Sequence, residues 1–255
     1  MKTSTTASAL DSGPLDVLPP EFKKDSGIEV QALAKGTGAA IRDGVDGNVD
    51  VIFVHDPERE EKFVADGYGT ERFKVMRNDF VIVGDHSDPA KISGLKSATE
   101  AFKKVADQKA EFISRGDDSG AHAREVAIWA KTGLPMKDKA PEGAWRLSVG
   151  QGMGKTLIMA AEKKAYALAD RGTYVAQKFG ANTPTSLEIL VQGDPELFNP
   201  YGVIPVNPAK RPQAKIEAAK KFAEWPVSER GQKVIANYKL NGQQVFYPDA
   251  IPAAK

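Results

Sequence analysis

Residues 28–55, IEVQALAKGTGAAIRDGVDGNVDVIFVH, decide the fold class of this chain. Residues 28–34 alternate between apolar and polar side chains as a strand does, and residues 49–54 form an apolar run rich in β-branched side chains. Between them, GTGAAIRDGV begins with a turn and continues as a helix. A strand, a helix and a second strand in this order indicate a parallel sheet, so we expect an α/β protein.

The same alternation extends in both directions from this stretch. An amphipathic helix is expected around Leu15, Leu18 and Phe22, and a long strand at residues 75–84. A second α/β lobe is expected from helices at residues 97–108, 119–132 and 154–170 and strands at residues 111–115 and 145–149. Two amphipathic helices, at residues 212–224 and 228–240, are expected to follow it.

Composition excludes several classes of function. The 255 residues contain 35 Lys and Arg against 34 Asp and Glu, without a basic block that would suit nucleic acid. The absence of cysteine removes disulfides, thiolate nucleophiles and Cys-based metal sites. No apolar run is long enough to span a membrane. The start, MKTSTTAS, lacks an apolar signal segment, so the protein is either cytoplasmic or exported with a signal peptide that has been removed.

Four turns share one design, in which a short strand is followed by Gly, Ser or Thr and then by a helix. They are residues 5–8 (TTAS), 36–38 (GTG), 115–120 (RGDDSG) and 150–154 (GQGMG). The first N–H groups of a helix lack intrahelical partners and carry a partial positive charge, so such turns bind anions. Each turn also has a purely structural explanation, because Ser and Thr cap helices and Gly is common in loops.

Enzyme signatures are weak in this sequence. The stretch GQGMGKT would need a glycine at position 149 to be a phosphate-binding loop, and that residue is Val149. In GTGAAI, Ile41 occupies the last glycine position of a dinucleotide fingerprint. The three histidines are far apart, and Ser119 lacks the flanking glycines of a nucleophile elbow. We therefore do not expect an enzyme.

Arg115 is the one charged side chain that we single out. It follows a short strand and precedes a Ser-Gly helix start, where its guanidinium would offer a fork of donors to an oxyanion. A salt bridge to Asp117, Asp118 or another acidic side chain is an equally good explanation.

These segments resemble the tungstate-binding proteins of ABC transporters. STTASALDSGPLDVLPPEFKKDSGIEV (residues 4–30) is similar to the opening of that family. The family's order continues with KGTGAAI, RNDFVIVG, SRGDDSGAHAREVAIW, GQGMGKTLIMAAEKKAYALADRGTY and NPYGVIPVNP. The resemblance covers residues 4–238, and SRGDDSG, GQGMG and DRGTY are its most distinctive parts.

The resemblance implies a type II periplasmic-binding-protein fold that encloses an oxyanion between two α/β lobes. Lobe 1 would comprise residues 1–79 and 203–255 and lobe 2 residues 80–202, with crossings near Asn78–Phe80 and Tyr201–Pro205. The implied oxyanion ligands are Thr6, Ser8, Ala9, Thr37, Arg115, Ser119, Gly154 and Tyr174. The sequence departs from the family at Ala7 and Ala121, where threonine is usual.

The implied function is capture of tungstate, without a cofactor, and its delivery to the membrane permease of an ABC transporter. Such a protein would be periplasmic and monomeric and would not bind nucleic acid. Two alternatives remain open at this stage. One is a protein that binds molybdate or another tetrahedral oxyanion. The other is a cytoplasmic enzyme or sensor that holds a phosphorylated metabolite at the same helix ends.

Overall fold

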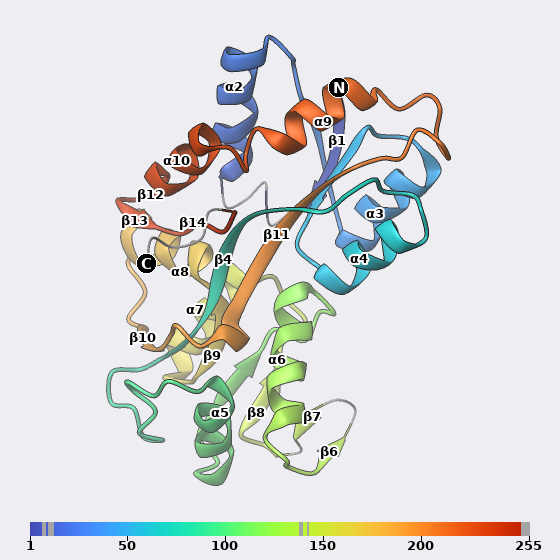
Figure 1. The fold of residues 1–255 in the computed structure, drawn as a ribbon. Helices are drawn as coiled ribbons and strands as arrows, with labels where there is room; N and C mark the ends of the chain where they lie inside the picture. Colours follow the sequence, from blue (N-terminus) through green and yellow to red (C-terminus); the bar gives the residue numbers. More distant parts are fainter. Residues whose placement is uncertain (7–8, 10–12, 138–139, 142, 251–255) are drawn as a thin grey trace. The chain divides into compact units, whose positions relative to one another are not determined.

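A computed structural model of the chain describes residues 1–6, 9, 13–137, 140–141 and 143–250 (Figure 1). The chain forms two compact units, unit 1 with Met1–Asn78 and Asn199–Lys255 and unit 2 with Asp79–Phe198. It passes from one to the other within β4 (Phe73–Gly84) and returns within β11 (Phe198–Pro205). The lobe boundaries given by the resemblance, 79/80 and 202/203, fall in the same two strands.

The sheet of unit 1 is parallel in its first three strands. β1 (Lys2–Thr6) lies between β2 (Gln31–Lys35) and β3 (Val51–Val54), and both neighbours run parallel to it. The last part of β11 pairs antiparallel with β3, and β14 (Tyr247–Pro248) pairs antiparallel with the start of β4. The parallel sheet predicted from residues 28–55 is therefore confirmed.

Both faces of β3 are buried, and helices cover one of them. α3 (Thr37–Asp46) and α4 (Pro57–Ala65) supply Ala40 and Phe63 to an apolar cluster that includes Ile52 of β3. Phe53, which points to the other face because side chains alternate along a strand, meets Tyr201 edge to face at 5.8 Å. Burial on both faces explains why this strand is continuously apolar.

Three further helices of unit 1 pack on one another. α2 (Pro14–Ser26) contacts α10 (Glu229–Asn237), and its Phe22 ring lies 5.2 Å from Phe222 of α9 (Ile216–Glu224). α2 continues through Pro19 and Pro20 as one helix (Figure 1). The short strands β12 (Lys239–Leu240) and β13 (Gln243–Gln244) follow α10.

Unit 2 contains the helices and strands of the second α/β lobe. They are α5 (Ala98–Asp107), β5 (Phe112–Ser114), α6 (Gly120–Lys131), β6 (Met136–Lys137), β7 (Ala140–Pro141), β8 (Arg146–Ser148), α7 (Met153–Lys163), β9 (Ala167–Asp170), α8 (Arg171–Val175), a π-helix (Ala176–Gly180), β10 (Glu188–Val191) and a 3₁₀ turn (Pro195–Leu197). β9 and β10 run antiparallel to β4, whereas β5 and β8 are parallel to each other. The rings of Phe102, Phe112 and Trp129 pack together in its core.

Four sequence-based element predictions are wrong in extent. The helices expected at residues 212–224 and 228–240 span only Ile216–Glu224 and Glu229–Asn237. The helix expected at residues 154–170 ends at Lys163, because Lys164 adopts the left-handed conformation with φ 53°. Residues 167–170 instead form β9, where pairing with β4 overrides the helical preference of alanine and leucine. β2 begins at Gln31, later than the alternation from residue 28 indicated.

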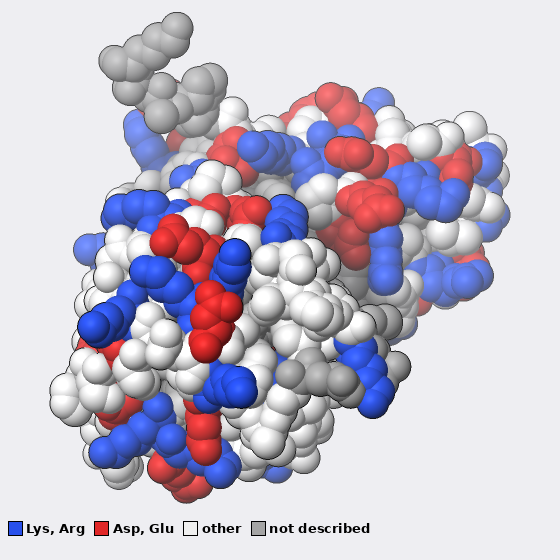
Figure 2. Space-filling view, turned by 90° about the horizontal axis from the view of Figure 1, so that it is seen from below, with Lys and Arg blue, Asp and Glu red and all other residues white. Residues whose placement is uncertain are grey.

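Charge is evenly distributed over the face shown in Figure 2, where basic and acidic side chains lie next to one another. Within the described residues, no helix has both the length and the apolar character that crossing a bilayer requires.

Candidate anion-binding site

Two of the four predicted turns are neighbours in unit 2. β5 and β8 are parallel with Ser114 opposite Ser148, so both strands end at the same edge. The chain leaves β5 into the RGDDSG turn and leaves β8 into the GQGMG turn. α6 and α7 therefore begin beside each other, with the first N–H groups of both helices at the carboxyl edge of the strands, where α/β sheets bind ligands.

Ser119 is the N-cap of α6. Its Oγ accepts a hydrogen bond from the backbone N–H of His122 at 3.3 Å, and its own N–H donates to Oδ1 of Asp117 at 3.2 Å. The helix start expected at residue 119 is confirmed by this geometry. The serine hydroxyl keeps its proton for a further acceptor, because the capping bond uses only a lone pair of its oxygen.

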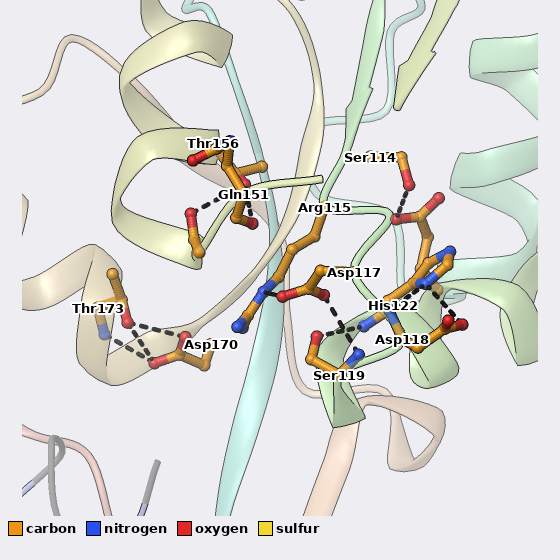
Figure 3. A network of polar contacts seen from close by, with 12 residues as sticks. Ser114, Arg115, Asp117, Asp118, Ser119, His122, Gln151, Thr156, Asp170 and Thr173 are labelled. Atoms are coloured by element: carbon orange, nitrogen blue, oxygen red, sulfur yellow. Dashed lines mark hydrogen bonds and ion pairs between the residues drawn. The ribbon is translucent and has the colours of Figure 1, made fainter. Parts of the chain in front are cut away.

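Arg115 forms the salt bridge that the sequence left as an alternative. Its Nε donates to Oδ2 of Asp117 at 2.7 Å, and each side chain is about a quarter exposed (24% and 22%). Figure 3 shows the guanidinium between the start of α7, near Gln151, and the turn that carries Ser119. Among the residues that the structure describes, no partner is assigned to its two terminal nitrogens, so the fork retains donors beyond the salt bridge.

The two acidic residues of the turn differ in their surroundings. Burial raises the pKa of Asp117, but hydrogen bonds from Ser119 and the charge of Arg115 outweigh it and hold this pKa below its usual value. Asp118 has a left-handed backbone with φ 55° and a side chain that is 92% exposed. Its carboxylate lies beside His122, on the side of the turn away from Arg115 (Figure 3).

A buried polar cluster supports the strand ends beneath these turns. Glu125 of α6 accepts hydrogen bonds from Ser114 Oγ at 2.8 Å, from Arg146 Nη2 at 2.8 Å and from Trp129 Nε1 at 3.1 Å. Arg146 also donates to Ser114 Oγ at 2.9 Å. This cluster joins α6 to both parallel strands, so the two turns share one rigid base.

Gly154 and Tyr174 occupy different environments in unit 2. Gly154 lies in the first turn of α7, which begins after the N-cap Gly152, and its carbonyl accepts a hydrogen bond from Gln177 Nε2 at 2.8 Å. Tyr174 is buried, and its hydroxyl donates to the carbonyl of Leu187 at 3.2 Å. Burial raises the pKa of Tyr174 to about 12, so its single proton stays on the oxygen and is used internally.

The end of β1 at Thr6 and the GTG turn are neighbours in unit 1. β1 and β2 are parallel with Thr6 opposite Lys35, so residue 6 and the Gly36–Thr37 turn leave the sheet at one edge. Ala9 is fully buried, and its N–H donates to Thr6 Oγ1 at 3.2 Å. Thr37 is the first residue of α3, after the N-cap Gly36. Ser8 lies outside the described residues.

Sequence patterns missed His55, whose side chain contacts Thr6. His55 Nε2 lies 3.1 Å from Thr6 Oγ1, and the signal for this contact is only that His55 directly follows the apolar strand β3. Among the described residues, no group of three or more His, Cys, Asp or Glu is placed to hold a metal cation.

Two α/β units that are connected by two strand crossings are typical of a periplasmic binding protein. A PBP superfamily domain matches residues 2–230. The fold is also similar to that of a periplasmic molybdate-binding protein from Azotobacter vinelandii, with a TM-score of 0.57 at 18% sequence identity over 94% of this chain and 99% of the other.

Relatives define the family more narrowly. The chain is 47% identical to the tungstate-binding protein TupA of Peptoclostridium acidaminophilum, over 97% of this chain and 85% of the relative. It is 38% identical to that of Campylobacter jejuni, over 94% of this chain and 87% of the relative. The structure of TupA from Desulfovibrio alaskensis matches with a TM-score of 0.93 at 43% identity, over 98% of this chain and 99% of the other.

The chain therefore belongs to the TupA family of tungstate-binding proteins within the PBP superfamily. This confirms the resemblance seen in the sequence and places the chain among solute-binding proteins rather than among enzymes.

Proposed function

We propose that this protein binds tungstate as a tetrahedral dianion and delivers it to the membrane permease of an ABC transporter. The observation that carries the proposal is the pair of neighbouring helix starts at the ends of β5 and β8 in unit 2; in unit 1, the end of β1 lies beside the start of α3, which follows β2. Family membership supports it, because relatives at 47% and 38% identity are named tungstate-binding proteins.

The proposed ligands come from both units. They are Thr6, Ser8, Ala9, Thr37, Arg115, Ser119 and Gly154. Tyr174 is proposed to act only by packing, because its hydroxyl proton is held by Leu187. Arg115 supplies the one full positive charge, and helix starts supply oriented N–H groups that need no reorganisation when a charged ligand arrives.

Tungstate and molybdate are both tetrahedral dianions of almost equal size, so the same donors suit both ions. Sulfate is smaller, and a site sized for tungstate would leave its hydrogen bonds too long. Phosphate carries a proton near neutral pH and requires an acceptor. Asp117 is the acidic side chain nearest to Arg115, but both of its oxygens already accept hydrogen bonds.

The proposal also covers the cellular location and the oligomeric state of the protein. A solute-binding protein of an ABC transporter works outside the cytoplasmic membrane, so we propose that the protein is periplasmic. It is proposed to act as a monomer that closes on its ligand and presents the closed form to the permease.

The direct test is a comparison of oxyanions by isothermal titration calorimetry and thermal unfolding. Tungstate and molybdate should stabilise the protein, by about 4 kcal/mol at a thousand times the dissociation constant, while sulfate, phosphate and nucleotides should not. Stabilisation by nucleotides or phosphorylated metabolites instead would favour the enzyme or sensor alternative. No response to any oxyanion would overturn the proposal.

A further inference from the structure

A chain of side-chain hydrogen bonds runs through the interior of unit 1. His55 Nε2 lies 3.1 Å from Thr6 Oγ1, and its Nδ1 lies 3.2 Å from Asn199 Oδ1. Asn199 Nδ2 donates to Asn78 Oδ1 at 2.8 Å, and Asn78 Nδ2 donates to the hydroxyl of Tyr201 at 3.4 Å. One end of the chain is thus a proposed tungstate ligand.

The other end of this hydrogen-bond series lies where the polypeptide leaves and re-enters unit 1. Asn78 on β4 is the last residue before unit 2, and Asn199 on β11 is the first residue after it. Both asparagines are buried, with 7% of each exposed. The hydrogen bond between them therefore ties together the two strands that any movement between the units must bend.

The hydrogen bonds of this series determine which atom donates and which accepts. Asn199 donates its amide to Asn78, so its oxygen must accept from His55 Nδ1–H. A neutral imidazole then presents Nε2 as an acceptor, to which the hydroxyl of Thr6 donates. Thr6 Oγ1 in turn accepts the N–H of Ala9 at 3.2 Å. Burial keeps the imidazole in this form by lowering the pKa of His55.

Histidine suits this position because it is an aromatic ring with polar atoms at both ends. The ring packs on Tyr201 with centroids 4.8 Å apart, a contact that phenylalanine would also make. Phenylalanine would remove both hydrogen bonds and leave Asn199 Oδ1 without this donor, which is costly in a buried site. The polar connection between Thr6 and Asn199 is therefore specific to His55.

We propose that His55 is a positioning residue that couples Thr6 to the strand crossings at Asn78 and Asn199. In this structure the Thr6 hydroxyl donates to His55 and the Ala9 N–H donates to Thr6, so bending of β4 and β11 as the protein closes would transfer these donors from their internal partners to the anion. The inference rests on the proposed function in that the anion is taken to be tungstate.

The test is a double-mutant cycle on tungstate affinity, measured by isothermal titration calorimetry. Thr6→Val and Asn199→Ala are made singly and together, first with His55 present and then with His55→Phe. With His55 present, the combined loss should differ from the product of the single losses by threefold or more. With His55→Phe, which by itself should weaken binding about tenfold, the two losses should multiply.

His86→Phe is the matched control, because the His86 side chain is 82% exposed and should tolerate the change without loss of affinity. A purely structural role would lower stability in His55→Phe but leave the coupling between Thr6 and Asn199 unchanged. That result, or wild-type affinity in His55→Phe, would overturn the inference.

Failure of the proposed function would be separately visible, because the wild-type protein would then bind no tungstate. In that case the same double-mutant cycle is carried out on the free energy of unfolding of the protein without ligand. Coupling that disappears with His55→Phe supports the positioning role, and additivity with His55 present overturns it.

Discussion

Arg171 binds Asp79 through two parallel hydrogen bonds, from Nε to Oδ1 at 2.7 Å and from Nη2 to Oδ2 at 2.6 Å. Both side chains are nearly buried, with 13% and 7% exposed. Asp79 is the first residue of unit 2 and directly follows Asn78, whose side chain is held within unit 1. The two sides of this strand crossing are therefore anchored by different partners.

Replacing Asp79 by alanine should destabilise unit 2. The change would leave the guanidinium of Arg171 buried without its carboxylate, which costs about 3–5 kcal/mol of unfolding free energy. Urea unfolding followed by circular dichroism measures the loss. Lys233→Ala, which removes an ion pair whose side chains are 67% and 78% exposed, is the control and should cause no resolvable change. Equal stabilities for the two variants would contradict this account of the crossing.

Arg115→Ala should weaken tungstate binding. A charge-assisted hydrogen bond contributes about 1.5–3 kcal/mol, so the dissociation constant should rise about 10- to 150-fold. Arg115→Lys keeps the charge but loses the planar fork, and its affinity should fall between those of the other two proteins. Calorimetry that gives the alanine variant wild-type affinity would leave the salt bridge to Asp117 as the whole role of Arg115.

The sequence predicted those parts of the fold that short-range patterns encode. The apolar run at residues 49–54 and the GTG turn before a helix were sufficient for the parallel sheet of unit 1. β1 is harder to predict by hydrophobicity, because its buried residues Thr3, Ser4 and Thr5 are polar, and Ser4 requires Asp43 as a partner. The sequence predicts helix for residues 167–170, because their strand pairing depends on β4, which is far away in the sequence.

The candidate site also contains some features that local sequence patterns predict and others that they do not. The turns that end at Ser119 and Gly154 are visible in the sequence, because helix starts have local signatures. The contact between His55 and Asn199 joins residues 144 positions apart, and no local pattern indicates it. Asp117 as the partner of Arg115 was one of two open explanations, and only side-chain geometry identifies the salt bridge.

Ser119→Ala and Ser97→Ala form a matched pair that separates capping from ligand binding. Both serines are N-caps with the same geometry, accepting from the N–H three residues later at 3.3 Å in α6 and 3.1 Å in α5. Each alanine variant should therefore lose about 1 kcal/mol of unfolding free energy. Only Ser119→Ala should also lower tungstate affinity, by about threefold or more, because only this hydroxyl is a proposed ligand. Equal tungstate affinities for the two variants would show that Ser119 is not a ligand.

Glu60 is a buried acid beside Gly202 of β11. Its side chain is fully buried, Oε1 accepts from the N–H of Asp56 at 2.6 Å, and Oε2 accepts from Arg72 Nε at 2.6 Å. A methyl group at Gly202 would overlap Oε2, so there is no room for the carboxylate to move toward that strand. Burial raises the pKa of Glu60 to about 7 and outweighs the opposing charge of Arg72.

This raised pKa predicts that Glu60 favours the folded protein at low pH. Below the unfolded value of 4.5 the acid is protonated in both states, and its contribution is fully present. As pH rises toward 7, the unfolded chain releases the proton while the folded protein retains it, so up to about 3 kcal/mol is lost. Glu60→Gln cannot titrate, so the wild type should lose stability relative to this variant across that window in urea unfolding. A difference that is constant with pH, or that grows in favour of the wild type as pH rises, would show that Arg72 rather than burial controls the acid.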